Sequence, residues 1–277
     1  MSQTCRRFLL ILFISISLLP AANAQDLSSS RPPQPPQVKA NVITKTLNGR
    51  QIYRRLLNST GWIVTKKSDS RSYSGTGWIV DADQRLFVTC HHVIARAKSF
   101  VVLFPDFRQG KLVTDPRHYQ RHVRGVRGKI IDSDPRCDLA LVQLESIPKN
   151  MRALPLAKQS AMPSDRLHVV GGKPRGSEAL WTYGRGVARS VNQQTIANGY
   201  RIQILQSQDG SDRGNSGGAV LNDSGKVVAV VQGGVTNARN VGLNVDLSEL
   251  KRYLKAGSQD SAGIGTARYT SLKRRTI

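Results

Sequence analysis

Short apolar runs separated by turn residues fill the chain between residues 59 and 250. Runs of this length, with Gly, Asn and Asp between them, are typical of all-β sandwiches and barrels. The runs form two sets. The first set predicts strands at Gly61–Thr65, Gly77–Asp81, Leu86–Thr89, Phe100–Phe104, Gly128–Asp132 and Leu139–Leu144. The second set predicts strands at Arg166–Val170, Leu180–Val191, Arg201–Gln206, Gly218–Asn222, Val227–Gln232 and Val241–Val245.

Helical periodicity occurs only beside the two sets of strands. In Thr46–Asn58 the apolar residues recur every three to four positions, which predicts a short amphipathic helix packed on the domain. A second helix is predicted at Asp246–Leu254, directly after the last strand. The sequence therefore predicts an all-β domain with one short helix at each end.

The first residues have the pattern of a secretory signal. Arg6 and Arg7 precede the apolar stretch 8–19, and Ala22-Asn23-Ala24 offers a small-residue cleavage site. Cleavage after Ala24 would remove residues 1–24 and place the mature protein in the periplasm or outside the cell. The alternative is an uncleaved membrane anchor.

Two further segments lie outside the predicted strands. Residues 25–45 are rich in Pro and Ser and predict an extended linker, and residues 251–277 predict a disordered basic tail.

The net charge of +23 becomes +21 when the two arginines of the signal are removed. Such a charge favours contact with anionic polymers or acidic lipids. No zinc-finger spacing or aromatic nucleic-acid signature is present, so no specific nucleic-acid partner is predicted. The alternative is that the cations only solvate surface loops. Many of them lie in one segment: Arg108, Lys111, Arg117, Arg121, Arg124, Arg127 and Lys129.

Candidate chemistry centres on Ser216, whose hydroxyl lies in the glycine-rich stretch Gly214-Asn215-Ser216-Gly217-Gly218. A serine needs a base to accept its proton, and a third group usually orients that base. His92 ends an apolar run and is the candidate base, with His91 as its rival. Asp138 begins another apolar run and is the candidate acid; Asp132 and Asp134 are weaker alternatives.

These motifs, taken in order, resemble the chymotrypsin-like serine proteases and most closely their HtrA-type branch. The resemblance covers residues 59–250 and rests on Gly75-Thr76-Gly77, Val88-Thr89-Cys90-His91-His92-Val93, Asp138-Leu139-Ala140-Leu141 and Gly214–Gly218. It implies two six-stranded antiparallel barrels, at about 59–160 and 161–250, within a protease domain at 46–250. It also implies a catalytic triad of His92, Asp138 and Ser216, with an oxyanion hole at Gly214, Asn215 and Ser216. Many HtrA-type proteases continue into a PDZ module, for which this chain has no room.

The predicted function is therefore that of an exported serine endopeptidase that cleaves unfolded or misfolded proteins through an acyl-enzyme. Two alternatives remain: a non-catalytic binding module on a protease fold, and a serine esterase. No cofactor is implied, and His91, His118 and His122 lack the spacing of a metal site. Protein or peptide substrates are the expected partners, and the oligomeric state is left open.

Two cysteines remain after the signal, Cys90 and Cys137. Each stands close in sequence to a proposed triad residue, so the sulfurs approach each other if His92 and Asp138 meet. An exported protein can keep a disulfide. Sequence neighbourhood does not fix the Cβ directions that a disulfide needs, so a Cys90–Cys137 bond and two free thiols are both open.

Overall fold

The computed structural model describes residues 46–66, 72–95, 97–172, 179–208, 215–234 and 241–260. The chain divides into two compact units, Met1–Ile43 and Thr44–Ile277, and every described residue belongs to the second. The predicted leader, the linker and the end of the predicted tail lie outside the described residues. Among the described helices, none is long and apolar enough to cross a membrane.

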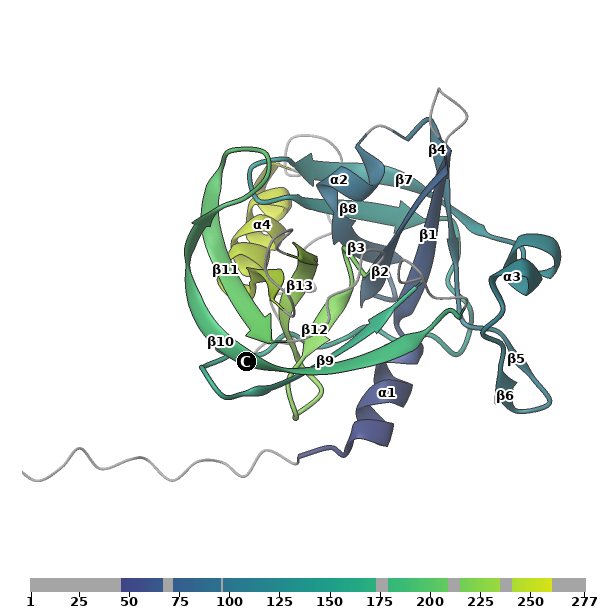
Figure 1. Cartoon of the computed structure of the whole chain (residues 1–277). Coiled ribbons are helices and arrows are strands. Elements are labelled where there is room, and N and C mark those ends of the chain that lie inside the picture. Colours follow the sequence, from purple (N-terminus) through teal and green to yellow (C-terminus); the bar gives the residue numbers. More distant parts are fainter. Residues whose placement is uncertain are drawn as a thin grey trace, which may run out of the picture. The chain divides into compact units, whose positions relative to one another are not determined.

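The first set of predicted strands closes into an antiparallel barrel (Figure 1). The strand order around the barrel is β1-β2-β3-β8-β7-β4. Strand β3 pairs with β2 on one side and with β8 on the other, and it is buried along its whole length. The strands are β1 (Thr60–Lys66), β2 (Ser72–Asp81), β3 (Leu86–Cys90), β4 (Ser99–Leu103), β7 (Val126–Asp134) and β8 (Leu139–Leu144).

The second set closes into another antiparallel barrel, with the order β10-β11-β14-β13-β12-β9. Strand β10 pairs with β9 along its first half and with β11 along its second, and a register shift between Ala188 and Ser190 lies in the β10–β11 pairing. The strands are β9 (Arg166–Gly171), β10 (Thr182–Thr195), β11 (Arg201–Gln208), β12 (Ala219–Leu221), β13 (Val227–Gly234) and β14 (Gly242–Asp246). Two closed six-stranded barrels confirm the predicted fold class.

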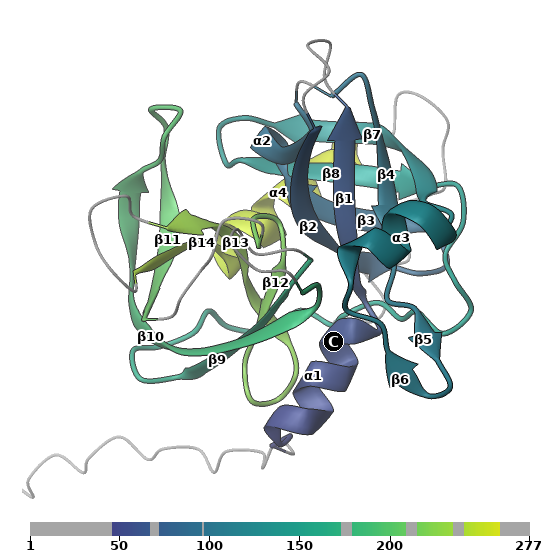
Figure 2. The ribbon, with the colours of Figure 1, turned by 45° about the vertical axis from the view of Figure 1, so that its right-hand side comes forward.

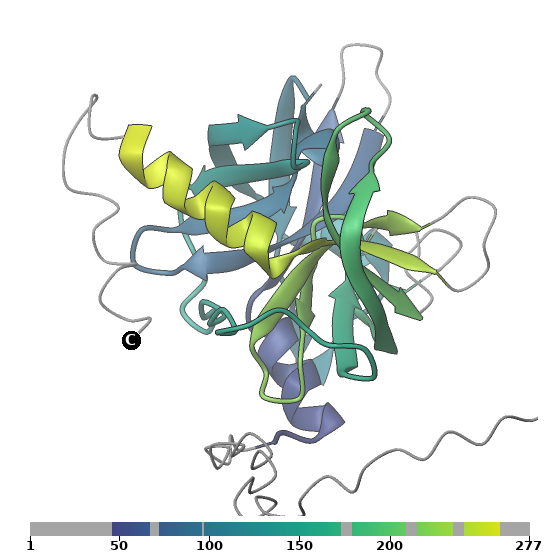
Figure 3. The same cartoon turned by 90° about the vertical axis from the view of Figure 1, so that its left-hand side faces the viewer.

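Both predicted end helices are present. Helix α1 (Gly49–Leu57) begins with a capping box in which the side chains and backbone N–H groups of Asn48 and Gln51 bond to each other. Its buried face carries Ile52, Leu56 and Leu57. Helix α4 (Leu247–Asp260) extends further than predicted (Figure 3). Residues 251–260 of the predicted disordered tail are thus helical.

Four elements were not predicted: the single-turn helix α2 (His91–Ile94), the paired strands β5 (Phe107–Arg108) and β6 (Lys111–Leu112), and helix α3 (Pro116–His122). The last three belong to an insertion between β4 and β7, seen beside the first barrel in Figure 2. Strands of two residues are too short to produce a hydrophobic period, so the sequence pattern gave no signal for them.

Candidate active site

His92 and Asp138 meet through a short hydrogen bond. His92 lies on α2, directly after β3, and Asp138 lies in the turn between β7 and β8. The His92 Nδ1 atom is 2.7 Å from Asp138 Oδ2, and the His92 backbone N–H donates to Asp138 Oδ1 at 2.9 Å. The carboxylate thus favours the tautomer that carries its proton on Nδ1, which leaves Nε2 free to accept one.

Burial and exposure differ sharply between the two side chains. The side chain of Asp138 is 5% exposed, whereas that of His92 is 46% exposed. Asp138 also has a positive φ of 56°, an unusual conformation for a residue with a side chain. Its backbone is fixed there by a bond from the His91 N–H to the Asp138 carbonyl at 3.0 Å. A buried carboxylate therefore orients an imidazole ring that reaches solvent.

Ser216 lies on a tight turn before β12 that only glycine can complete. Gly217 has a φ of 89°, and a Cβ at this position would lie 2.2 Å from the Thr76 carbonyl oxygen. The turn is held against the first barrel because the Thr76 N–H donates to the Ser216 carbonyl at 2.8 Å. The two barrels thus meet at the candidate nucleophile.

Gln232, on β13, contacts both sides of this site. Its side-chain Nε2 donates to Asp138 Oδ2 at 3.3 Å, and its carbonyl oxygen accepts from Ser216 Oγ at 3.1 Å. Within the described part of the chain, the Ser216 hydroxyl makes this bond and none to the His92 ring. The structure brings the three predicted residues into one cluster, with the proton of Ser216 directed to the Gln232 carbonyl.

Sequence reasoning missed Gln232. It lies inside an apolar strand and belongs to none of the motifs, so only the pairing of β13 places its amide beside Asp138.

The residues considered as alternatives to His92 and Asp138 are placed elsewhere. His91 is half-buried and its Nδ1 lies 2.7 Å from Ser133 Oγ, while Asp134 is paired with Arg136 at 3.0 Å. The ring of His91 is therefore directed to Ser133 and not to Asp138.

Only part of the predicted oxyanion hole is described, because Gly214 lies outside the described residues. Asn215 is buried, and its Oδ1 atom has no hydrogen-bond partner among the described groups. A Cβ at Gly171 would lie 1.6 Å from that oxygen, so Gly171 provides the space that Asn215 occupies.

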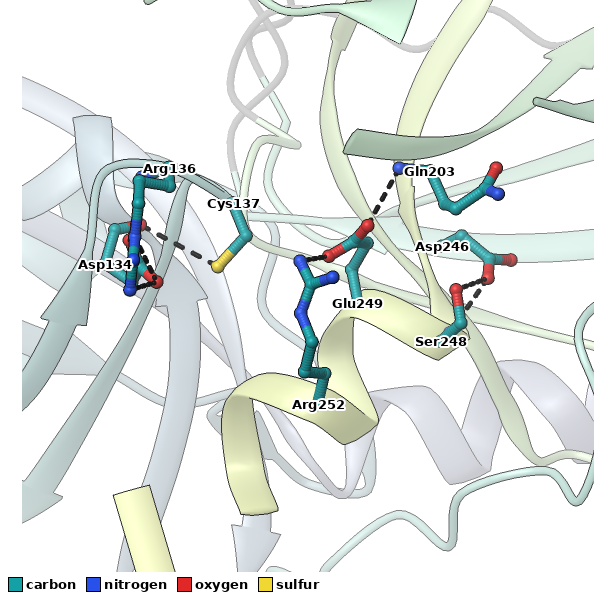
Figure 4. A network of polar contacts seen from close by, with 8 residues as sticks. All are labelled: Asp134, Arg136, Cys137, Gln203, Asp246, Ser248, Glu249 and Arg252. Atoms are coloured by element: carbon teal, nitrogen blue, oxygen red, sulfur yellow. Dashed lines mark hydrogen bonds and ion pairs between the residues drawn. The ribbon is translucent and has the colours of Figure 1, made fainter. Parts of the chain in front are cut away.

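Both cysteines are free thiols, so the disulfide considered from the sequence is not formed. The reason is the direction of the side chains: Cys90 Sγ donates to the Val231 carbonyl at 3.3 Å, and Cys137 Sγ points to the Asp134 carbonyl at 3.8 Å (Figure 4). Burial, together with the charge of Asp138, raises the pKa of the Cys90 thiol well above its ordinary value. Burial likewise raises the pKa of the Cys137 thiol to about 12.

One group among the described residues could offer three atoms to a metal ion. Ligand atoms of Cys90, His92 and Asp138 lie within 4.8 Å of one another. The His92 and Asp138 atoms are already hydrogen-bonded, and the Cys90 thiol holds its proton. An ion would have to break that bond and deprotonate the thiol, so the arrangement suits proton transfer better than metal binding.

The comparison with protein families decides the classification. The model of the trypsin-like peptidase domain matches residues 75–230, a region that includes His92, Asp138 and Ser216. The chain belongs to this family. Among curated relatives of this trypsin-like domain, the periplasmic serine endoprotease DegP of Escherichia coli K12 is 29% identical over 156 residues. A probable DegP-like periplasmic endoprotease of Chlamydia muridarum is 31% identical over 156 residues.

Each of these alignments covers 56% of the present chain but only 29% of the E. coli protein and 27% of the Chlamydia protein. The trypsin-like domain thus corresponds to less than a third of either relative. Among solved structures, the active form of the Rv3671c protease from M. tuberculosis has a TM-score of 0.62 at 16% identity. That match covers 81% of this chain and 90% of the other. The HtrA-type protease AlgW, solved with a tripeptide, has a TM-score of 0.59 at 20% identity, over 76% of this chain and 62% of AlgW. Both have the same fold as this trypsin-like domain.

Proposed function

We propose that the chain is a serine endopeptidase in which Ser216 attacks the peptide bond, His92 transfers the proton and Asp138 orients His92. The observation that carries this proposal is that Gln232 forms two hydrogen bonds in the site. Its side chain donates to Asp138, and its carbonyl oxygen accepts from the Ser216 hydroxyl. These two bonds, with the bond between His92 and Asp138, link residues from distant parts of a trypsin-like domain. The binding-module alternative offers no reason for that convergence. A serine esterase would use the same three residues, but its nucleophile usually stands on a turn between a strand and a helix, whereas Ser216 is followed by strand β12.

In the proposed reaction, His92 Nε2 accepts the Ser216 proton while Oγ bonds to the substrate carbonyl carbon. His92 then gives that proton to the amine nitrogen as the carbon–nitrogen bond breaks, which leaves an ester on Ser216. Water, deprotonated by the same ring, hydrolyses the ester. The first step requires Ser216 Oγ to leave the Gln232 carbonyl and turn to His92. Catalytic hydrogen bonds commonly form only when substrate is bound.

The backbone N–H groups of Gly214 and Ser216, with Asn215 between them, are proposed to hold the oxyanion. The glycine-rich turn supports this role because it can direct neighbouring N–H groups to one point. The positive φ of Gly217 and the space that Gly171 leaves for Asn215 are consistent with such a turn.

We further propose that the protein acts in the periplasm or outside the cell on unfolded or misfolded proteins. The relatives named periplasmic endoproteases support the compartment. The charged and apolar pattern of residues 1–24, with cleavage after Ala24, supports export. The protease domain is proposed to span residues 46–250, preceded by a linker at 25–45.

The decisive experiment measures casein degradation and labelling by a fluorophosphonate probe. Ser216→Ala should abolish both, and His92→Ala should reduce both by several orders of magnitude. His91→Ala is the matched control and should retain activity, because His91 bonds to Ser133 rather than to the triad. If the wild-type protein neither degrades casein nor reacts with the probe at Ser216, the result would favour the non-catalytic binding module. Loss of activity in His91→Ala with retention in His92→Ala would reverse the assignment of the base.

A further inference from the structure

The insertion between β4 and β7 plays no part in the proposed reaction, yet it is a well-defined structure. It consists of the hairpin of β5 and β6, residues 107–112, followed by α3. In Figures 1 and 2 the hairpin and α3 lie beside the first barrel, and the tip of the hairpin points away from it. We call residues 107–112 the 107–112 hairpin.

The base of this hairpin is held rigidly by Tyr119 of α3, which is 1% exposed. The Tyr119 hydroxyl donates to the Val113 carbonyl at 2.8 Å and accepts from the Asp106 N–H at 2.9 Å. It also accepts from Trp181 Nε1 at 2.8 Å, and this bond fastens the insertion to the segment before β10. These hydrogen bonds thus fix the base of the hairpin, and its tip remains exposed.

The turn of the hairpin exposes a phenylalanine. Gln109 and Gly110 have φ values of 50° and 75°, as a two-residue primed turn requires. In the register that follows, Phe107 pairs with Leu112. Phe107 is 49% exposed, the highest value among the aromatic residues that the structure describes. An apolar ring is therefore presented to solvent on a fixed support.

Positive charge surrounds this ring. Arg108 stands directly opposite Lys111, so two like charges face each other across the strand pair, and Asp106 is bonded to Arg108. The two acids of the insertion are engaged: Asp106 with Arg108 and His118, and Asp115 with Arg117. The exposed cations of the insertion are Arg108, Lys111, Arg117, Arg121 and Arg124.

We propose that the 107–112 hairpin docks the protein on an anionic lipid surface. Basic residues next to an exposed aromatic ring are the combination that binds such an interface, because the cations meet the headgroups and the ring enters the acyl boundary. A soluble polyanion would use the cations but leave Phe107 in water. The anionic partner predicted from the net charge is therefore a membrane surface rather than a soluble polyanion. The hairpin contains none of the proposed catalytic residues, so docking does not depend on catalysis.

The first experiment measures co-sedimentation with vesicles of phosphatidylcholine containing about 30% phosphatidylglycerol, against vesicles of pure phosphatidylcholine. All proteins are full-length chains with the same N-terminus and Ser216→Ala, so that residues 8–19 and proteolysis affect each sample equally. The protein with the wild-type hairpin should bind the anionic vesicles more strongly than the neutral ones. Arg108→Gln with Lys111→Gln should weaken binding about thirtyfold, and Phe107→Ala about tenfold. Met162→Ala, at another exposed apolar position, should not weaken it.

The second experiment locates the ring directly. The three tryptophans of the chain, Trp62, Trp78 and Trp181, are all buried. Phe107→Trp therefore adds one exposed tryptophan, whose emission should shift to shorter wavelength with anionic vesicles and remain unshifted with polyphosphate. Binding that is equally strong in Phe107→Ala, or an unshifted Phe107→Trp on anionic vesicles, would overturn the proposal in favour of a purely electrostatic contact.

Discussion

At the scale of single residues, the site depends on which atom holds each proton. His92 Nδ1 and Gln232 Nε2 both donate to Asp138 Oδ2, and His92 Nε2 is left as the acceptor. The carboxylate is buried, and the hydrogen bond that it accepts from His92 determines both the orientation and the tautomer of the ring. Changes that preserve the shape of these side chains but remove a donor or a charge therefore test the site most directly.

Gln232→Leu should lower kcat about tenfold, the effect expected when a long hydrogen bond to a charged group is removed. The carbonyl of residue 232 remains in the variant, so the contact with Ser216 is kept. The measurement is steady-state cleavage of a peptide substrate across pH, which also reports any shift of the pH profile. Gln143→Leu is the matched control, because Gln143 Nε2 donates to the Gln84 carbonyl at the same 3.3 Å, remote from the site. An equal loss in both variants would assign the effect of Gln232→Leu to stability.

Asp138→Asn should lower kcat by about 10⁴-fold while KM changes little. The neutral amide cannot stabilise a protonated ring, and its N–H₂ group favours the wrong tautomer of His92. Single-turnover kinetics with an active ester separates this effect from substrate binding. Retention of more than a tenth of the activity would show that Asp138 is not the orienting acid.

The two thiols should resist alkylation in the folded protein. Burial raises the pKa of both Cys90 and Cys137, so neither forms a thiolate at neutral pH. Iodoacetamide at about pH 8, close to the ordinary thiol pKa, should modify both within minutes in urea and neither in native buffer, as measured by mass spectrometry. Rapid native labelling of either residue would contradict the buried, protonated state.

At the scale of secondary-structure elements, the insertion and the second barrel are joined by few but buried groups. Burial raises the pKa of Tyr119, so the hydroxyl stays protonated and can donate to the Val113 carbonyl. Tyr53, on α1, likewise donates to the Trp181 carbonyl at 2.9 Å. Trp181 is thus fixed by both α1 and α3, and its own φ is positive at 61°.

Tyr119→Phe should destabilise the protein by about 2–4 kcal/mol, because it leaves the buried Trp181 N–H and the part-buried Asp106 N–H and Val113 carbonyl without a partner. Urea unfolding followed by tryptophan fluorescence measures the change. Tyr200→Phe is the control, since Tyr200 is exposed, and it should change the free energy of unfolding by less than about 0.5 kcal/mol. A similar small change for Tyr119→Phe would mean that water satisfies the freed groups.

At the scale of the whole molecule, each end helix faces the barrel to which it is not adjacent in sequence. Helix α1 precedes the first barrel, yet Arg55 Nη1 donates to the Gly225 carbonyl of the second at 3.1 Å. Helix α4 follows the second barrel, yet it lines one pocket with the β7–β8 turn of the first (Figure 4). The turn that carries Asp138 is held from the second half of the chain by Gln232, whose Nε2 donates to Asp138 Oδ2.

Stability should fall in acid, and Asp223 should contribute to the fall. Burial raises the pKa of Asp223, but hydrogen bonds from Arg166 and His168 outweigh burial and the net pKa is lowered. A carboxyl whose folded pKa is lowered stabilises the protein above its unfolded pKa of about 3.9, and this stability disappears as pH falls through the folded pKa. Urea unfolding between about pH 5 and 2 should show a smaller loss for Asp223→Asn than for the wild type. The exposed Asp83→Asn is the control and should lose as much stability as the wild type; equal slopes in all three proteins would contradict the role of Asp223.

How much the sequence determined depends on the range of the interaction. Alternating and continuous apolar runs are local, and they predicted all twelve barrel strands, although β2 begins at Ser72 rather than at Gly77 and β10 ends at Thr195 rather than at Val191. The motifs also predicted His92, Asp138 and Ser216, since each residue type is required by the chemistry and stands beside a strand end. The far end of α4 and the 107–112 hairpin were not predicted, because neither depends on a local hydrophobic period.

Tertiary structure alone decided which groups touch. The one-turn helix α2 directs the His92 ring to Asp138 and the His91 ring to Ser133. The role of Gln232 and the free state of Cys90 and Cys137 depend on side-chain directions that strand pairing sets. A sequence specifies residue types and their order. Directions and distances between residues far apart in the chain arise only when the barrels close.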